Sequence, residues 1–243
     1  MKRIYADLHL CPNLKNLEQV SRMANKALAL GYELIAVAVP LSHVGEIERL
    51  KDLFREAEID LALRLDLKPR TPSELLRNLR MFRRKFEIIA VACDSKNIAR
   101  QAAKDRRVDL LSFPSLDFHR RFFDKAEAEL ASSALASLEI DMKPLLMLEG
   151  SARIRLLLNL RREVAIAHDF HVPIVISSGV SDEMLMRKQR ELAALAYLFD
   201  LNKVSSMEAV SKNAVAIVKR NREKLSSRFV APGIRIIRRG NDC

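Results

Sequence analysis

An apolar, strand-like run returns along most of the chain, and this recurrence is the feature that most constrains the fold. Successive runs start 22 to 35 residues apart, with stretches of helical periodicity between them. The runs cover residues 3–8, 33–39, 59–67, 87–93, 109–113, 137–142, 172–177 and, weakly, 203–206. Regular strand-helix alternation is typical of a parallel sheet covered by helices. We therefore predict a single (β/α)8 TIM-like barrel, with an open doubly wound sheet as the alternative.

The local turn and capping residues agree with this alternation. Gly31 follows the first helical stretch as a C-cap residue does, and Thr71 with Pro72 opens the third. The pattern stops after residue 225, so we assign residues 1–227 to the barrel domain and 228–243 to a basic C-terminal tail. Ile234, Ile236 and Ile237 predict a short strand in that tail. No Gly-x-Gly-x-x-Gly follows the first strand, which argues against a dinucleotide site.

Charge and composition narrow the classes of partner. The chain of 243 residues has 42 Lys and Arg against 31 Asp and Glu, a net charge of +11, which favours a polyanion or an acidic partner. The first residues lack a secretory signal, and no stretch is long and apolar enough to span a membrane, so we expect a cytoplasmic protein. Trp is absent and Tyr scarce, which argues against an RNA-stacking platform of aromatic residues.

In a barrel of this type the chemistry lies at the carboxyl ends of the strands. Asp7-Leu8-His9-Leu10-Cys11 resembles the opening motif of the PHP phosphoesterases, although Cys11 replaces the second His of their metal-binding pair. A metal-dependent phosphoesterase using Asp7, His9 and Glu139 is therefore the alternative function. The leading interpretation is a barrel with neither a metal nor a catalytic residue, in which Asp66 with Lys68, and Asp141 with Lys143, form ion pairs.

The basic residues gather in the strand-helix units of the second half of the barrel. Arg100, Arg120, Arg153 and Arg187 each come early after a strand, which predicts that they lie near one rim of the barrel. Arg side chains at such a rim suit RNA phosphates, because the guanidinium group donates two parallel hydrogen bonds. The candidate RNA-binding residues are Arg100, Arg120, Arg153, Arg187, Lys188 and Arg190. Arg84 and Arg107 end helices, where a cation satisfies the helix dipole.

An ordered series of segments resembles the RNase P protein component 3 family, the barrel-fold protein subunit of archaeal-type ribonuclease P. The segments are Arg100, 107–112, 123–124, 128–131, 138–140, 144–146, Gly150, Arg153, 173–179, 186–187, 190–192 and 217–221. Each segment is short, and the specificity comes from their order over about residues 90 to 225. The rest of the chain resembles the family in its strand-helix layout. The resemblance also implies a fold related to that of the PHP phosphoesterases.

The resemblance implies a function in tRNA processing. Ribonuclease P removes the 5′ leader of precursor tRNA, and its RNA subunit carries the chemistry with Mg²⁺. A member of the family binds and organises that RNA without catalysing the reaction alone. It also implies a complex with RNase P protein component 2, with two copies of each, and contacts with other RNase P proteins. The family's basic residues correspond to Arg100, Arg120 and Arg187 of this chain.

Overall fold

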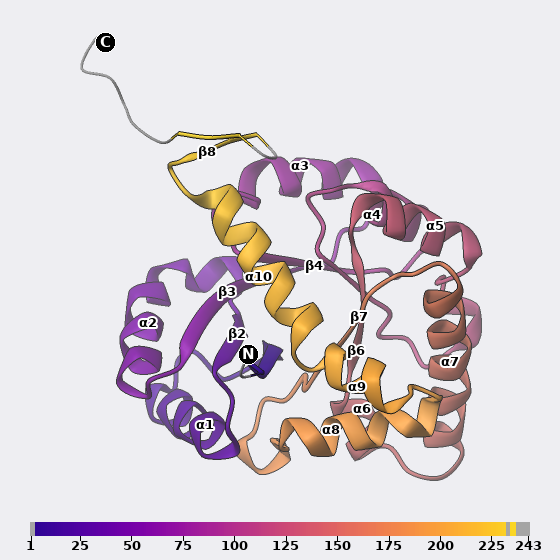
Figure 1. Cartoon of the computed structure of the whole chain (residues 1–243), viewed down its shortest axis with the longest axis horizontal. Helices are drawn as coiled ribbons and strands as arrows, with labels where there is room; N and C mark the ends of the chain where they lie inside the picture. The colour runs from indigo at the N-terminus through magenta and orange to yellow at the C-terminus, as the bar shows by residue number, and fades with distance from the viewer. Residues whose placement is uncertain (1–2, 232–233, 237–243) are drawn as a thin grey trace.

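Seven parallel strands form a nearly closed barrel in the computed structural model, which describes residues 3–231 and 234–236 (Figure 1). Each strand pairs with the next one along the chain, in the order β1 to β7. The strands are β1 Ala6–Leu10, β2 Leu34–Ala38, β3 Asp60–Leu67, β4 Ile88–Ala92, β5 Leu110–Ser112, β6 Ser137–Asp141 and β7 Ile174–Ser177. The predicted TIM-like barrel is confirmed.

Helices surround the barrel, and their apolar faces pack against the outer face of the sheet. They are α1 Leu17–Leu30, α2 Ile47–Glu56, α3 Pro72–Phe82, α4 Lys96–Lys104, α5 Lys125–Ala134, α6 Lys143–Met147, α7 Gly150–Asp169, α8 Gln189–Leu195, α9 Lys203–Ala209 and α10 Lys212–Leu225. The capping residues fulfil their predicted roles, because Gly31 ends α1 at a φ of 86° and Thr71 accepts a hydrogen bond from the amide of Glu74. None of the helices in the described residues is long and apolar enough to cross a membrane.

The eighth predicted strand, residues 203–206, is a helix. The side chain of Asn202 accepts hydrogen bonds from the amides of Val204 and Ser205, at 3.0 and 2.9 Å, and so starts α9 at this point. Strands β1 and β7 instead meet directly at their carboxyl ends, where the amide of Gly179 donates to the carbonyl of His9 at 2.9 Å.

At their amino ends, the segment that leads into α10 bridges the same two strands. The amide of Ala6 donates to the carbonyl of Val210 at 3.2 Å, and the side-chain amide of Asn213 donates to the carbonyl of Ile174 at 2.8 Å. Helix α10 then crosses the amino-terminal opening of the barrel, which faces the viewer in Figure 1. Its Ala214, Ile217 and Val218 pack on apolar side chains of the strands, which closes this end.

The interior of the barrel has an apolar layer and a polar layer. The apolar layer lies under α10 and consists of side chains such as Leu34, Ile88 and Leu110. The polar layer lies toward the carboxyl ends of the strands and contains His9, Arg64 and Glu139. A register shift between Asp7 and Leu10 marks a bulge in β1, and it lets the side chain of His9 face inward although Leu8 also does.

The tail forms a two-stranded antiparallel sheet of β8 (Phe229–Ala231) and β9 (Ile234–Arg235), as the sequence predicted for its start. The remainder of the predicted strand, at Ile237, lies outside the described residues. The predicted helix over 182–201 is interrupted: two 3-10 turns, Glu183–Leu185 and Ala196–Phe199, flank the short α8. The assignment of the tail as a unit separate from the barrel stays a prediction.

Candidate functional site

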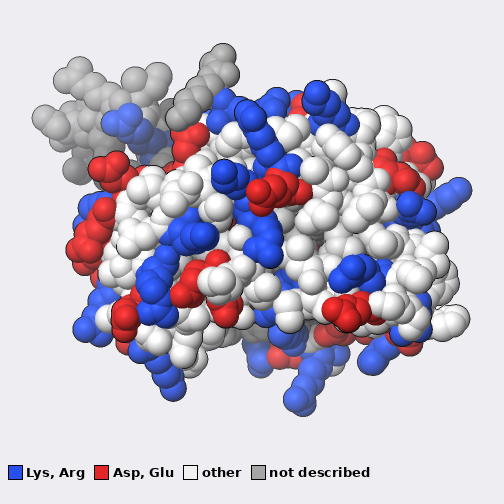
Figure 2. Space-filling model, turned by 90° about the horizontal axis from the view of Figure 1, so that it is seen from below, with Lys and Arg blue, Asp and Glu red and all other residues white. Residues whose placement is uncertain are grey.

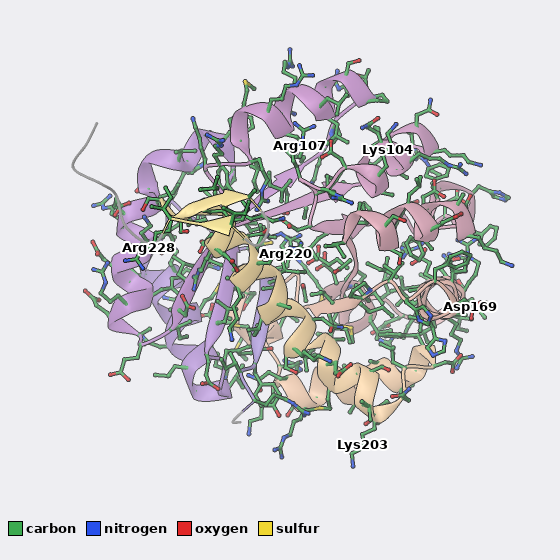
Figure 3. All side chains as sticks on the ribbon, turned by 45° about the horizontal axis from the view of Figure 1, so that its top comes forward. Lys104, Arg107, Asp169, Lys203, Arg220 and Arg228 are labelled. Atoms are coloured by element: carbon green, nitrogen blue, oxygen red, sulfur yellow. The ribbon has the colours of Figure 1, made fainter. Side chains whose placement is uncertain are left out.

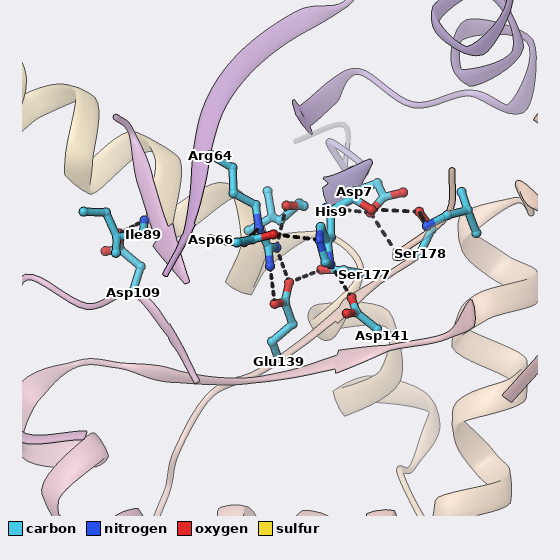
Figure 4. Close-up of polar contacts among 12 residues, drawn as sticks. Asp7, His9, Arg64, Asp66, Ile89, Asp109, Glu139, Asp141, Ser177 and Ser178 are labelled. Carbon is cyan, nitrogen blue, oxygen red and sulfur yellow. Dashed lines mark hydrogen bonds and ion pairs between the residues drawn. The ribbon is translucent and has the colours of Figure 1, made fainter. Parts of the chain in front are cut away.

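Arg64, on β3, lies at the centre of the polar layer inside the barrel (Figure 4). Its guanidinium group donates to both carboxylate oxygens of Glu139, with Nη2 and Oε2 2.6 Å apart. Its Nε donates to Asp66 at 2.6 Å, and its Nη1 donates to the carbonyl of Leu8 at 2.8 Å. The side chains of Arg64 and Glu139 are 1% and 0% exposed, so this is a fully buried ion pair. It connects β1, β3 and β6 across the interior.

His9 is held between two further carboxylates. Its Nδ1 lies 2.8 Å from Oδ1 of Asp141, and its Nε2 lies 3.1 Å from Oδ2 of Asp66. A carboxylate only accepts hydrogen bonds, so both ring nitrogens can be satisfied only if both carry a proton. The geometry therefore indicates a positively charged imidazole, and Asp66 joins the His9 and Arg64 parts of the cluster.

The Ser-Ser-Gly turn after β7 supports this cluster. The hydroxyl of Ser177 donates to Glu139 at 2.7 Å, and the amide of Ser178 donates to Asp7 at 2.9 Å. Gly179 has a φ of 64°, and a Cβ there would lie 2.9 Å from the side chain of Asp141. The turn thus requires glycine for two reasons, its backbone conformation and its contact with Asp141. The serines have structural contacts and do not form a nucleophile with a base.

The pKa values reflect the same pairing. Burial and the charge of Arg64 act to lower the pKa of His9, but the contacts with Asp141 and Asp66 outweigh them and raise it well above its usual range. Burial would raise the pKa of Asp66, yet Arg64 and His9 together hold it well below its usual range. The charged forms of these side chains are therefore the stable ones at neutral pH.

The residues of this centre do not fit a metal ion. His9, Glu139 and Asp141 do bring ligand atoms within 4.8 Å of one another, as the PHP-like motif predicts. However, Glu139 is bonded through both oxygens to Arg64, and both nitrogens of His9 are bonded to carboxylates. A divalent cation would have to displace these partners and lie beside a buried guanidinium group. Asp7 has one buried oxygen without a hydrogen-bond partner, but it lies outside this group of three.

Sequence reasoning found most of the acids of this centre but missed Arg64. The predicted pairs of Asp66 with Lys68 and of Asp141 with Lys143 are wrong: both acids face His9, and Lys143 reaches Ser181 at 3.1 Å. The reason is that the buried cations are closer and better oriented than the lysines beyond the strand ends. A usable signal was Arg64-Leu65-Asp66 within an apolar strand, since residues two apart share one face.

A second buried ion pair fixes the loop between β5 and α5. Arg121 donates from Nε and Nη2 to the two carboxylate oxygens of Glu163, with Nε and Oε1 2.6 Å apart. Its Nη1 also donates to the carbonyls of Phe113 and Ser115. Arg121 is therefore a structural residue, while the adjacent Arg120 is exposed.

The six predicted RNA-binding residues differ in how free their charges are. Arg120, Lys188 and Arg190 are exposed, and none of the three is in an ion pair. Arg153 is exposed and donates from Nε to the carbonyl of Leu148. The remaining two are committed to other contacts.

Arg100 is 40% exposed and bonds Glu127 at 3.1 Å and Asp124 at 3.4 Å. Arg187 donates to the carbonyls of Met184 and Met186, at 2.8 and 3.0 Å. The acids of α5 therefore already neutralise Arg100, and the backbone already uses one nitrogen of Arg187.

The structure does not bring these residues to one rim. Tyr32, which precedes β2, donates its hydroxyl to the carbonyl of Arg187 at 3.0 Å. Arg190 shares a hollow with Arg3, Tyr5 and Glu33, which lie at the amino-terminal ends of β1 and β2. The long loop after β7 thus carries Arg187 and Arg190 along α1, away from the carboxyl ends of the strands. Basic side chains on the side of α8 and α9 have acidic side chains between them (Figure 2).

Fold and centre together define the class of protein: a TIM-like barrel whose polar interior is occupied by buried ion pairs. The chain matches the RNase P subunit p30 family over residues 4–226. It therefore belongs to that family, in agreement with the resemblance read from the sequence.

Relatives in the same family cover nearly the whole chain. The ribonuclease P protein component 3 of Methanosarcina barkeri is 27% identical over 236 residues, which are 96% of this chain and 95% of the relative. The protein of the same name from Methanocaldococcus jannaschii is 29% identical over 147 residues, which are 60% of this chain and 63% of the relative.

Solved structures share the fold. A chain in the cryo-EM structure of archaeal ribonuclease P with mature tRNA superposes with a TM-score of 0.81 at 22% identity, over 97% of this chain and all of that one. A crystal structure of an amidohydrolase superposes with a TM-score of 0.55 at 10% identity, over 91% and 75% of the two chains. The barrel architecture is thus shared with enzymes as well as with a ribonuclease P structure.

Proposed function

We propose that this chain is a protein subunit of ribonuclease P that supports removal of the 5′ leader from precursor tRNA by binding and organising the RNA subunit. The observation that carries the proposal is the family match over residues 4–226. The buried Arg64–Glu139 pair supports a role without catalysis by this chain, because it occupies the place where a barrel enzyme holds its reacting groups. Mg²⁺ would then act with the RNA subunit.

The phosphodiester backbone of RNA is the ligand that suits the exposed cations. Arg120, Arg153, Lys188 and Arg190 carry the free charges of the predicted set, so they are the residues we assign to RNA. Arg100 and Arg187 retain fewer free donors and have a smaller expected effect. RNA binding of this kind must weaken with salt, because each neutralised phosphate releases counterions.

Reconstitution of the holoenzyme tests the proposal. Ribonuclease P RNA and the other protein subunits are assembled with and without this chain, and 5′ leader removal is measured. We expect activity at moderate Mg²⁺ to fall when the chain is left out. Arg120→Gln and Arg190→Gln should lower activity, whereas Arg49→Gln, an exposed residue paired with Glu46 on the side of α2, should not. Equal activity without the chain would refute the function.

The protein partner remains a finer proposal. We propose that RNase P protein component 2 binds this chain, with two copies of each in the complex, and that other RNase P proteins join the assembly. Light scattering of the two purified components without RNA measures the mass of the complex directly. A mass equal to the separate chains would rule this pairing out.

A further inference from the structure

A cluster of cations lies at the amino-terminal end of the barrel, opposite to the carboxyl ends where the sequence placed the RNA contacts. The cluster, here called the amino-end cluster, joins the last turn of α3, the end of α4 and its following loop, and the second half of α10. Its members are Arg83, Lys104, Arg106, Arg107, Arg220 and Lys224. Lys104, Arg107 and Arg220 are labelled in Figure 3, which turns this side of the molecule toward the viewer.

Asp109 is the acid at the centre of the cluster, and its hydrogen-bonding capacity is used up. Its Oδ2 accepts from Arg83 at 2.6 Å and from the amide of Ile89 at 2.9 Å. Its Oδ1 accepts from Arg220 at 3.0 Å and from Asn221 at 2.8 Å. One negative charge therefore serves two guanidinium groups and leaves a net positive charge. Nε of Arg220 is also buried without a hydrogen-bond partner.

The other cations of the cluster add to this excess. Arg107 forms a local pair with Asp105 at 2.7 Å. Lys104, Arg106 and Lys224 are exposed, and in the described part of the chain no carboxylate pairs with them. The carboxylates bonded to the six cations of the cluster are thus Asp105 and Asp109.

The field of the cluster acts on its own members. Desolvation by the surrounding chain and the positive charges of Arg220, Arg83 and Arg106 lower the pKa of Lys224, against the opposing effect of Asp109. Arg83 also donates to the carbonyl of Arg107, at 3.4 Å, which ties the α3 and α4 parts together. An anion placed among these side chains would relieve their mutual repulsion without having to break an ion pair.

We propose that the amino-end cluster is a second RNA-binding surface, which takes phosphate groups of a folded RNA. The inference rests on the proposed function, since it assumes that the chain works bound to RNA. Its chemistry is that of a phosphodiester backbone: several separated cations on three elements, fixed by Asp109 from below, suit a row of phosphates better than one small anion. The RNA can be the ribonuclease P RNA or the precursor tRNA.

Binding measurements with charge-matched variants test the surface. The cluster variant combines Lys104→Gln, Arg106→Gln and Lys224→Gln, and the control variant combines Lys15→Gln, Lys26→Gln and Lys203→Gln. All six residues are exposed and unpaired, so both variants should keep the thermal unfolding midpoint of the wild type. The affinity of the full-length chain for each RNA is measured from 50 to 200 mM salt.

We expect the cluster variant to lose roughly 0.9 of salt slope per lost phosphate contact, so two to three in total, on one of the two RNAs. The RNA that shows the loss is the one that contacts the cluster. The control should keep the wild-type slope. Unchanged slopes for the cluster variant on both RNAs would overturn the surface but leave the proposed function intact, as long as the wild type binds RNA.

Two further outcomes separate the explanations. If the wild-type chain binds neither RNA and is dispensable in the reconstituted enzyme, the proposed function itself fails. If the cluster variant binds both RNAs like the wild type but no longer retains an acidic protein of the complex, the surface belongs to a protein and the RNA proposal is overturned.

Discussion

Arg64 decides what the inside of this barrel can do. Its guanidinium group is completely buried, donates to Glu139, Asp66 and a backbone carbonyl, and occupies the position between the acids where a catalytic cation would otherwise act. A buried pair of this kind contributes little net stability compared with an apolar core, but breaking it exposes the cost of an unpaired charge. The residue therefore makes the centre structural.

Replacing Arg64 should destabilise the fold strongly. Arg64→Met leaves Glu139 buried without its partner, and we expect a loss of about 3–5 kcal/mol in the free energy of unfolding, measured by urea denaturation. Arg64→Met combined with Glu139→Leu should recover part of this loss, because no charge is then left unpaired. Arg22→Met, which removes an exposed pair with Glu183, serves as the control and should cost less than about 1 kcal/mol. A loss as small as the control's would contradict the buried pairing.

The charge of His9 predicts a pH dependence. Its pKa is raised in the folded state, so its stabilising effect is complete below the unfolded value near 6.5 and is lost as the pH rises through the folded value. We expect the stability difference between wild type and His9→Gln to be largest near pH 6 and to shrink toward alkaline pH. Thermal unfolding from pH 6 to 10 measures this. A difference that does not change with pH would mean that His9 is neutral in the fold.

At the scale of elements, α10 takes over part of the work of an eighth strand. It covers the amino-terminal opening with Ala214, Ile217 and Val218, and Asn221 bonds the carbonyl of Glu87 and the carboxylate of Asp109, both at 2.8 Å. Arg222 extends these contacts to Asp60. The helix is therefore fixed to the starts of β3, β4 and β5, and it belongs to the core of the barrel.

Removing the polar anchor of α10 should loosen this end of the barrel. Asn221→Ala leaves buried acceptors without their donor, and we expect a loss of about 1–3 kcal/mol in the free energy of unfolding. The matched control is Asn16→Ala on α1, which removes an exposed N-cap and should cost about 1 kcal/mol. Hydrogen exchange should be faster in α10 and at the start of β5 in the Asn221 variant. Protection equal to the wild type in α10 would show that the apolar contacts suffice.

At the scale of the whole molecule, the net charge of +11 is divided between structural and free cations. Arg64, Arg83, Arg121 and Arg222 are used to hold acids inside or at the base of the barrel. The free cations lie on more than one side, at Arg120 and Arg153, at Arg190, and in the amino-end cluster. Such a distribution suits a large RNA that contacts the protein on several faces.

Chelation tests the reading of the whole molecule as a barrel without a metal. Dialysis against EDTA should leave the thermal unfolding midpoint unchanged, and added Mn²⁺ or Zn²⁺ should not raise it, because a ligand that binds only the folded state would stabilise it. Metal analysis of the purified chain and hydrolysis of a phosphoester by the chain alone complete the test. A stoichiometric metal with chelator-sensitive turnover would revive the phosphoesterase alternative.

The sequence by itself determined the barrel, the family and most of the acids of the centre, because strand-helix periodicity, capping residues and short motifs are local signals. The tertiary structure alone decided which charges meet. Arg64 and Glu139 are 75 positions apart, and Asn221 and Asp109 are 112 apart, so no local pattern links them. It also decided that residues 203–206 form a helix, that α10 closes the barrel, and that Arg187 leaves the carboxyl-end rim. Each depends on which partner a group finds once the core is packed, and packing joins elements far apart in the chain.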